Sequence, residues 1–341
     1  MSRLSPYLFC TVGLIVALLV SAGLGAVSIP PLDVTQMLWA KLTLQPLTVW
    51  PEAWATILFS IRLPRVALIA LTGAALAGSG AAYQGLFRNP LADPYLIGIA
   101  AGAGLGAVVA MAAQWPSTLL GLAVVPVSAC MGAVLTVMLV LQLARVGRTA
   151  SVTNLILAGV AVGAFATALM TFMMLRSSGE LRRAMAWLLG GFALGGWGPV
   201  LAALPYVVVG LGILIALARP LNVLQFGEEQ AEQLGLNVER LKFLLIGAAT
   251  LTTAAAVAFA GLIGFVGLVV PHITRLWWGP DYRRLLPLSV LVGAATLLLA
   301  DVAARTVLAP QELPVGIITA LAGAPFFLWL LRREGVNRAQ A

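Results

Sequence analysis

The stretch Leu119–Leu143, LLGLAVVPVSACMGAVLTVMLVLQL, decides the fold class because it is apolar almost without interruption. A helix needs about 20 apolar residues to cross roughly 30 Å of hydrocarbon. The strands of a membrane barrel instead alternate apolar and polar residues over about ten positions. Leu8–Ile29 is equally continuous. The sequence therefore predicts membrane-spanning helices.

The overall composition extends this prediction to the rest of the chain. The 341 residues are 61% hydrophobic and 9% charged, and their mean hydropathy is +1.02, whereas a soluble domain is about 25% charged. Leu8–Ile29 follows only Arg3 and is longer than the apolar core of a signal peptide, so we expect it to be retained as the first span. We predict an all-α polytopic membrane protein with a single transmembrane domain over residues 1–341.

Ten spans fit the pattern of polar and proline-containing breaks. They are expected at residues 7–29, 64–86, 95–113, 118–144, 152–175, 198–217, 241–260, 262–277, 285–307 and 314–332. Within residues 252–275, three glycines and Pro271 leave two interpretations open, one kinked helix or two shorter helices.

The basic residues test this count because Lys and Arg concentrate in cytoplasmic loops. With ten spans and a cytoplasmic N-terminus, thirteen of the twenty basic residues lie inside and seven outside. Removing one span from residues 252–275 would move Arg275, Arg283 and Arg284 outside and even the balance. The distribution favours ten spans with both termini cytoplasmic. Because the arginines lie between spans and not in one block, nucleic acid is not an expected partner.

A polar, helix-prone island, NVLQFGEEQAEQLGL at residues 222–236, interrupts the apolar pattern. Its Glu228, Glu229 and Glu232, together with nearby Glu239, make up a third of the twelve acidic residues of the chain. A protein that consists mostly of membrane spans has little reason to keep such an insert unless a partner outside the bilayer docks there. We therefore predict a docking surface at this island.

Several chemistries are excluded by missing residues. The only lysines, Lys41 and Lys242, do not follow a glycine, so there is no G-x-x-x-x-G-K-[ST] loop to bind ATP. The single histidine, His272, excludes an HExxH zinc site and any histidine cluster. Cys10 and Cys130 both lie within apolar spans, where a disulfide or a metal pair is not expected. The sequence predicts no catalytic residue, metal or cofactor in this chain.

Asp301 is the only acidic residue within a predicted span, and it lies near the outer end of that span. Arg305 follows one helical turn later and is expected to pair with it. No series of titratable residues remains for a proton relay near the middle of the bilayer. A proton-coupled secondary carrier is kept as an alternative class, and an intramembrane enzyme lacks the necessary nucleophile and base.

Two connecting segments have the residues of functional turns. In FRNPLADP, residues 87–94, two prolines with Asn89 and Asp93 are expected to end one helix and cap the next, where the turn could narrow a pathway. On the outer side, Arg62 and Arg65 directly precede a span. These two charges suit either an acidic docking partner or lipid headgroups.

Six motifs together resemble the FecCD-type permeases, which are the membrane subunits of ABC importers for iron-siderophores, haem and cobalamin. They are IRLPR at 61–65, GAALAGSG at 73–80, QGLFRNPLADP at 84–94, GEEQAEQLG at 227–235, GFVGLVVPHITR at 264–275 and ELPVG at 312–316. The resemblance runs from about residue 8 to 333. It implies ten helices per subunit, a homodimer with the pathway at its interface, two cytoplasmic ATPase subunits that bind ATP and Mg, and an external binding protein.

The resemblance also implies roles for particular residues. Residues 222–236 are similar to paired coupling helices that sit in the ATPase, with contacts from Leu224, Gly227, Glu228, Glu229, Glu232, Leu234 and Gly235. An inner gate is implied at Asn89, Leu91, Val152 and Thr153, although cobalamin permeases carry small hydroxyl residues at both of the last two positions. The implied contacts to the binding protein are Arg62, Arg65 and Arg305.

The function that the resemblance implies is ATP-driven import across the bacterial inner membrane by alternating access. An iron-siderophore-type chelate is the expected substrate, and cobalamin or haem are the alternatives. Residues 180–192 are similar to the cobalamin branch of the family. ATP hydrolysis would belong to the partner subunits, so the chain itself is not expected to be an enzyme.

Overall fold

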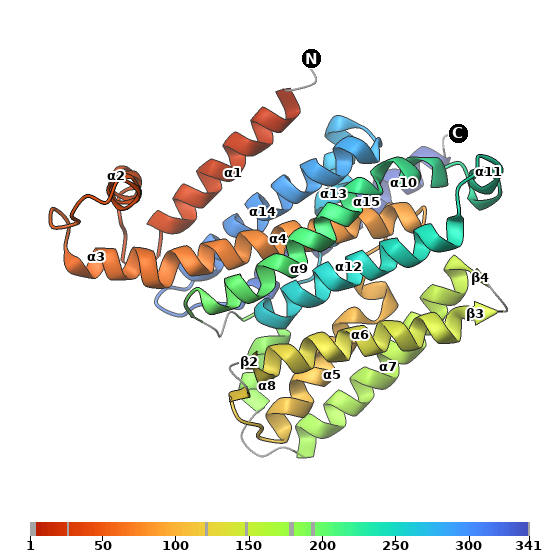
Figure 1. Cartoon of the computed structure of the whole chain (residues 1–341), viewed down its shortest axis with the longest axis horizontal. Coiled ribbons are helices and arrows are strands. Elements are labelled where there is room, and N and C mark those ends of the chain that lie inside the picture. The colour runs from red at the N-terminus through yellow and green to blue at the C-terminus, as the bar shows by residue number, and fades with distance from the viewer. Residues whose placement is uncertain are drawn as a thin grey trace.

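Apolar segments form helices along nearly the whole chain (Figure 1). The computed structural model describes residues 5–25, 27–119, 122–146, 149–176, 181–191 and 195–339. Its α-helices are α1 Ser5–Gly23, α2 Pro31–Leu42, α3 Glu52–Thr56, α4 Leu63–Leu86, α5 Ile99–Ala112, α6 Val124–Ala144, α7 Val152–Arg176, α8 Leu181–Leu188, α9 Gly198–Ala216, α10 Ala218–Leu224, α11 Glu228–Gln233, α12 Val238–Ala260, α13 Val266–Trp278, α14 Tyr282–Thr306 and α15 Val315–Ala339.

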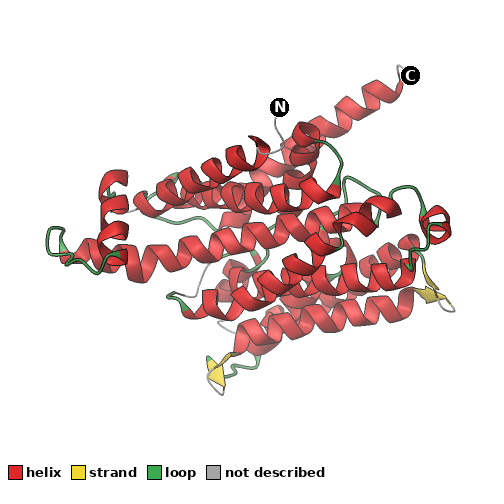
Figure 2. Cartoon of the chain, turned by 45° about the horizontal axis from the view of Figure 1, so that its top comes forward, coloured by secondary structure: helices red, strands yellow, loops and turns green. Residues whose placement is uncertain are grey.

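Short irregular elements complete the described chain. A π-helical turn, η1 Ile57–Arg62, continues α3 into α4, and a 3₁₀ turn, η2 Pro94–Ile97, precedes α5. Two antiparallel hairpins of two-residue strands, β1 Thr118–Leu119 with β2 Leu122–Ala123 and β3 Arg145–Val146 with β4 Thr149–Ala150, lie at opposite ends of the bundle (Figure 2). The end with α2, α3, α8 and β2 is called the α2 end below, and the end with α10, α11 and β3 is called the α11 end (Figure 1).

Seven of the described helices are long and apolar enough to cross a membrane. These are α1, the continuous helix over Glu52–Leu86, α6, α7, α9, α12 and α14. Two shorter apolar helices, Ile99–Ala112 and Val315–Leu330, and the 13-residue α13 occupy the remaining predicted spans. The nearly all-helical membrane architecture is as predicted, whereas the count of ten spans stays a prediction.

Two helices begin later in the structure than the predicted spans do, for local reasons. The span predicted at 95–113 begins as the 3₁₀ turn η2, and α5 starts only after Gly98, whose φ of 83° interrupts the helix. Thr118–Leu119 and Leu122–Ala123 pair as β1 and β2, so α6 begins at Val124 and is shorter than the predicted 118–144. Residues 261–265 are not helical and separate α12 from α13, which settles the open choice within 252–275 in favour of two helices.

The core of the bundle depends on glycines at which helix backbones meet. The carbonyl of Gly293 on α14 lies against Gly73 on α4, and the carbonyl of Gly267 on α13 lies against Gly80 on α4. Gly102 and Gly106 on α5 meet the backbone of α6 in the same manner. Small residues at such positions allow close helix packing without a hydrophobic driving force. Helix packing at Gly73, Gly102 and Gly106 is therefore backbone to backbone.

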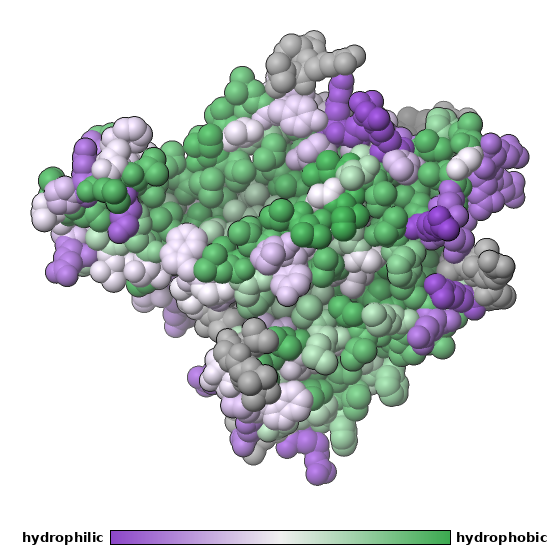
Figure 3. Space-filling view, in the orientation of Figure 1, coloured by the Kyte–Doolittle hydropathy of each residue, from purple (hydrophilic) through white to green (hydrophobic). Residues whose placement is uncertain are grey.

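The outer faces of several helices remain apolar and exposed. On α7, Phe165, Phe172 and Leu175 point outward, and α1 and α6 expose similar side chains. Figure 3 shows hydrophobic residues over most of the visible face, with hydrophilic residues gathered toward its edges. Soluble proteins rarely expose apolar surface on this scale. The surface is that expected of helices that face lipid or another membrane subunit.

Candidate transport and coupling sites

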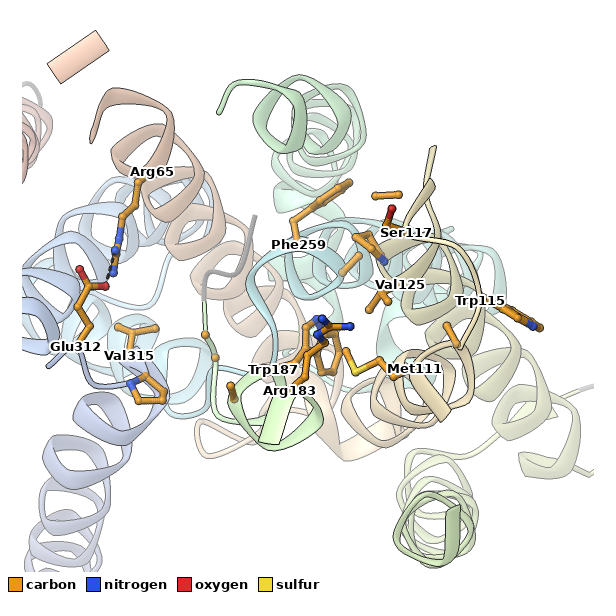
Figure 4. Close-up of a pocket in the computed structure, with 18 of the residues that line it drawn as sticks. Arg65, Met111, Trp115, Ser117, Val125, Arg183, Trp187, Phe259, Glu312 and Val315 are labelled. Carbon is orange, nitrogen blue, oxygen red and sulfur yellow. Dashed lines mark hydrogen bonds and ion pairs between the residues drawn. The ribbon is translucent and has the colours of Figure 1, made fainter. Parts of the chain in front are cut away.

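A cavity of about 730 Å³ lies at the α2 end of the bundle. Its walls come from α5, α6, α8, α12 and the segment before α15, and they include Met111, Trp187 and Phe259 (Figure 4). Arg65 and Glu312 stand at one side of the cavity and are joined by an ion pair of 2.7 Å. Such a mixed lining can accommodate part of a large amphipathic molecule through apolar contacts and few directed polar ones.

A buried ion-pair network closes the bundle at the same end. Asp301 on α14 is fully buried and accepts from Arg305 Nε at 2.7 Å and from Arg65 Nη2 at 2.9 Å. Arg305 also donates to the carbonyls of Ser21 and Leu24 at 3.1 and 2.8 Å. The Asp301–Arg305 pair predicted from their spacing is confirmed, and it joins α14 to the end of α1.

Arg62 has a similar internal role. Its Nη1 donates to the carbonyls of Ala22 and Gly23 at 2.9 and 2.8 Å, and its Nη2 donates to the carbonyl of Val27. The guanidinium therefore binds carbonyls at the end of α1 and just after it, which the helix itself does not hydrogen-bond.

This burial corrects the expectation that Arg62 and Arg305 face an external partner. The two side chains are only 6% and 7% exposed, and their donors are engaged within the chain. Arg62 lies just before one predicted span and Arg305 near the outer end of another, and neither position revealed that the segment after α1 folds over them. Of the three implied docking arginines, Arg65 alone keeps a substantial surface, at 25% of its side chain.

The predicted inner gate turn, residues 87–93, is a compact structure held by its own side chains. The Asn89 side-chain oxygen accepts from the backbone N–H of Leu91 at 2.9 Å, and Asp93 accepts from the N–H of Tyr95 at 2.8 Å. The Tyr95 hydroxyl donates to the Ile263 carbonyl at 3.1 Å, which links the turn to the segment between α12 and α13. The prolines and Asn/Asp pattern correctly predicted a capping turn.

The second implied gate segment begins α7 at the α11 end. Val152 is half-buried and Thr153 is exposed in the first turn of this helix. Further along α7, Gly159 lies against the carbonyl of Leu96, so the helix packs directly on η2, which follows the first gate turn. The structure therefore connects the two implied gate segments through the η2–α7 contact.

The predicted island forms two short helices, α10 and α11, that differ from each other in burial. On α10, Leu221 and Leu224 are buried against the bundle. Gly227 and Gly235 take φ angles of 115° and 85°, which favour glycine and separate α11 from its neighbours. Between them α11 buries only Ala231 among its described residues.

The acidic residues of α11 have two different roles. Glu229, Glu232 and the following Leu234 are exposed. Glu228 instead forms an ion pair of 2.6 Å with Lys242 on α12, whose side chain is only 4% exposed. Lys242 also contacts Glu239 at 3.2 Å. Glu228 therefore fixes α11 to α12, while Glu229 and Glu232 project from the surface.

Other contacts at the α11 end have no simple sequence signal. Arg275 on α13 donates to the Gln84 side chain at 3.0 Å and to the Tyr282 hydroxyl at 3.4 Å. Asn222 on α10 contacts Asp281 from 59 residues away. Only the folded chain brings these positions together. Within the described residues no cluster of three or more His, Cys, Asp or Glu side chains could hold a metal ion.

An apolar helical bundle with a cavity at one end and two short helices, α10 and α11, at the other suits a membrane transport protein. The family model described as the FecCD transport family matches residues 13–333. The chain therefore belongs to the FecCD transport family and is a membrane permease of the ABC importer class.

Individual relatives agree with this family. The ABC transporter permease YvrB of Bacillus subtilis is 42% identical over 334 residues, which cover 98% of this chain and 95% of that protein. The cobalamin import permease BtuC of Halobacterium salinarum is 50% identical over 287 residues, with coverages of 84% and 76%. The hemin transport permease HmuU of Yersinia pestis is 40% identical over 347 residues and covers 99% of both chains.

A solved structure extends the similarity to three dimensions. A metal-chelate type ABC transporter in an inward-facing conformation matches with a TM-score of 0.82 and 32% identity, and the match covers 97% of this chain and 99% of that one. The chain therefore shares its whole fold with a transporter subunit.

Proposed function

We propose that this chain is the permease subunit of an ATP-driven importer that moves a large iron-siderophore-type chelate across the bacterial inner membrane. Cobalamin and haem are the alternative substrates, and the similarity to a cobalamin permease and a hemin permease supports keeping both. The mostly apolar lining of the cavity at the α2 end suits a bulky cargo that is released rather than tightly bound.

The complete importer would contain two copies of this chain, two ATPase subunits and an external binding protein. The α11 end, with both chain termini, would face the cytoplasm, as the distribution of basic residues favours. Arg65 would meet the binding protein, while the buried Arg62 and Arg305 hold the adjoining structure in place. The exposed faces of the outer helices would meet lipid or the second copy.

In the proposed mechanism, the ATPase subunits act on α10 and α11. Closure of the ATPase upon ATP binding would displace these helices, and the gate segments at 87–93 and at the start of α7 would follow. Access to the pathway would then alternate between the two sides of the membrane. A ligand can shift such an equilibrium only through its different affinity for the two states, so ATP binding must favour one of them.

The main support for this proposal is that Glu229 and Glu232 on α11 and Leu234 at its C-cap are exposed, while the neighbouring α10 buries Leu221 and Leu224 in the bundle. A partner that binds the exposed surface of α11 could therefore displace α10 and, with it, the helices that α10 contacts. The chain contains no phosphate-binding loop of its own, so the force would come from a separate subunit.

Replacing both Glu229 and Glu232 with Lys tests the docking. We expect at least about a tenfold loss of ATPase that co-purifies with the permease, because reversed charges disfavour the original partner surface. Glu228 is left unchanged because its reversal would break the pair with Lys242.

The matched control is Glu52→Lys, which makes the same charge change on an exposed residue of α3 at the opposite end. This variant should retain the ATPase fully. Full retention by the Glu229/Glu232 variant would contradict docking at α11.

A further inference from the structure

The helix α10 is attached to two different helices of the bundle by amide side chains. Asn222 donates from Nδ2 to Asp281 Oδ1 at 2.6 Å, and its Oδ1 accepts from the backbone N–H of Tyr282 at 2.9 Å. Gln225, one residue after α10, donates from Nε2 to the carbonyl of Gly85 at 2.9 Å. The first contact reaches the start of α14 and the second reaches the last turn of α4.

Apolar packing reinforces the contact with α4. Leu221 is fully buried, and its side chain lies directly against Gly85. Gly85 is in turn one residue from the end of α4, where the turn at 87–93 begins. A displacement of α10 would therefore act at the base of this turn.

A second set of contacts joins the same helices to α13. The Gln84 side chain on α4 donates to the Leu268 carbonyl at 3.1 Å and accepts from Arg275 at 3.0 Å. Arg275 also reaches the hydroxyl of Tyr282, at the start of α14. The ends of α4, α13 and α14 are thus cross-linked to one another, and Asn222 adds α10 to them.

The charge of Asp281 strengthens its bond with Asn222. Burial raises the pKa of the Asp281 carboxyl, but two other effects outweigh it and lower the pKa below its usual value. These are hydrogen bonds from the Arg283 N–H and from Asn222, and the positive charges of Arg283 and Arg284. Asp281 is therefore a carboxylate at neutral pH. Hydrogen bonds to an ionised acceptor are shorter and stronger than neutral ones, which agrees with the 2.6 Å separation.

Asp281 also organises the start of α14. Its side chain accepts from the backbone N–H of Arg283 at 2.9 Å as the N-cap of this helix. Asn222 contacts both the cap side chain and the N–H of the next residue, Tyr282. At this helix terminus the NH₂ group of Asn222 therefore donates to the Asp281 carboxylate, and its carbonyl oxygen accepts from the Tyr282 N–H.

We propose that Asn222 is a positioning residue that couples α10 to the start of α14, so that movement imposed on α10–α11 is transmitted to the transport helices. This inference rests on the proposed docking of the ATPase at α10–α11. Without the contact, α10 and α11 would still bind the ATPase and act on α4 through Leu221 and Gln225, but they would move with less effect on α14. ATP would then be hydrolysed with less transport.

The test uses the complete importer in proteoliposomes and measures substrate transported per ATP hydrolysed. Asn222→Asp places two carboxylates in contact, and Asp281→Asn removes the charged acceptor. Asn222→Asp should lower the transport ratio by at least about fivefold, and Asp281→Asn, whose neutral amide oxygen can still accept from Asn222, should lower it by less, while the amount of co-purified ATPase stays unchanged in both. Unchanged co-purification of the ATPase and recovery in the double variant distinguish loss of this contact from misfolding of Asn222→Asp.

The double variant N222D/D281N distinguishes coupling from a general structural effect. In this variant the amide NH₂ of residue 281 can donate to the carboxylate of residue 222. That carboxylate can still accept from the Tyr282 N–H, and the amide oxygen of residue 281 can still cap α14. We expect the double variant to recover most of the wild-type ratio.

Asn237→Asp is the matched control, because Asn237 caps α12 nearby and Asp is an equally good N-cap.

Two results would overturn the inference. One is an unchanged transport ratio in both single variants with the ATPase retained. The other is a double variant that couples as poorly as the single variants. Failure of the docking proposal has a different signature, since the Glu229/Glu232 lysine variant would then keep its ATPase.

Discussion

Replacing Asp301 with Asn is expected to lower the free energy of unfolding by about 3–5 kcal/mol, the usual cost of removing one partner from a buried ion pair. Asp301 is fully buried and accepts from both Arg305 and Arg65. A neutral amide has one acceptor oxygen, and its NH₂ group would face a guanidinium donor. Arg305, only 7% exposed, would lose its carboxylate partner inside the bundle.

The measurement is thermal unfolding of the purified permease in one detergent, compared with Glu312→Gln. Glu312 also pairs with Arg65, at 2.7 Å, but its side chain is 54% exposed. An exposed ion pair contributes roughly 0–1 kcal/mol, so the same carboxylate-to-amide change should have little effect there. Equal melting temperatures for the two variants would show that the buried network does not stabilise the fold.

Gly80→Ala is expected to have the second-largest effect on stability. A Cβ atom at this position on α4 would overlap the backbone carbonyl of Gly267 on α13, which no side-chain rotation can relieve. The two helices would have to separate, and overpacking of this kind costs about 1–3 kcal/mol or more. Because α13 also contacts Gln84 through Leu268, the separation should reduce transport as well.

Gly247→Ala on α12 is the matched control. A Cβ atom there has no neighbour within 4 Å, and Ala is the better helix former by about 1 kcal/mol. The control should unfold at the same temperature as the wild type or at a higher one. A Gly80→Ala variant as stable as this control would contradict the close backbone contact between α4 and α13.

Features determined by local sequence were predicted well. The apolar runs located most of the long helices, and the i,i+4 spacing predicted the pair of Asp301 with Arg305. The turn at 87–93 was predicted because proline and Asn/Asp side chains act on their own backbone. Each of these signals lies within a few residues of the structure that it determines.

Features that depend on distant contacts were not predicted. The burial of Arg62 arises from carbonyls about 40 residues earlier in the chain, and the position of a charged residue beside a span does not reveal it. Asn222 looked like the first residue of a docking segment, but its partners are Asp281 and Tyr282. Likewise, the three glutamates of the island looked equivalent until the pair of Glu228 with Lys242 separated their roles.

We propose that this chain is a passive pathway driven by a separate ATPase. The most direct measurement is uptake of labelled cargo by proteoliposomes that contain either the purified chain alone or the chain with its ATPase and binding protein. Ferric siderophore, cobalamin and hemin would be compared as cargoes. We predict uptake only with the complete assembly and ATP. Accumulation of cargo by the chain alone, driven by a proton gradient without ATP, would contradict the account and favour a secondary carrier.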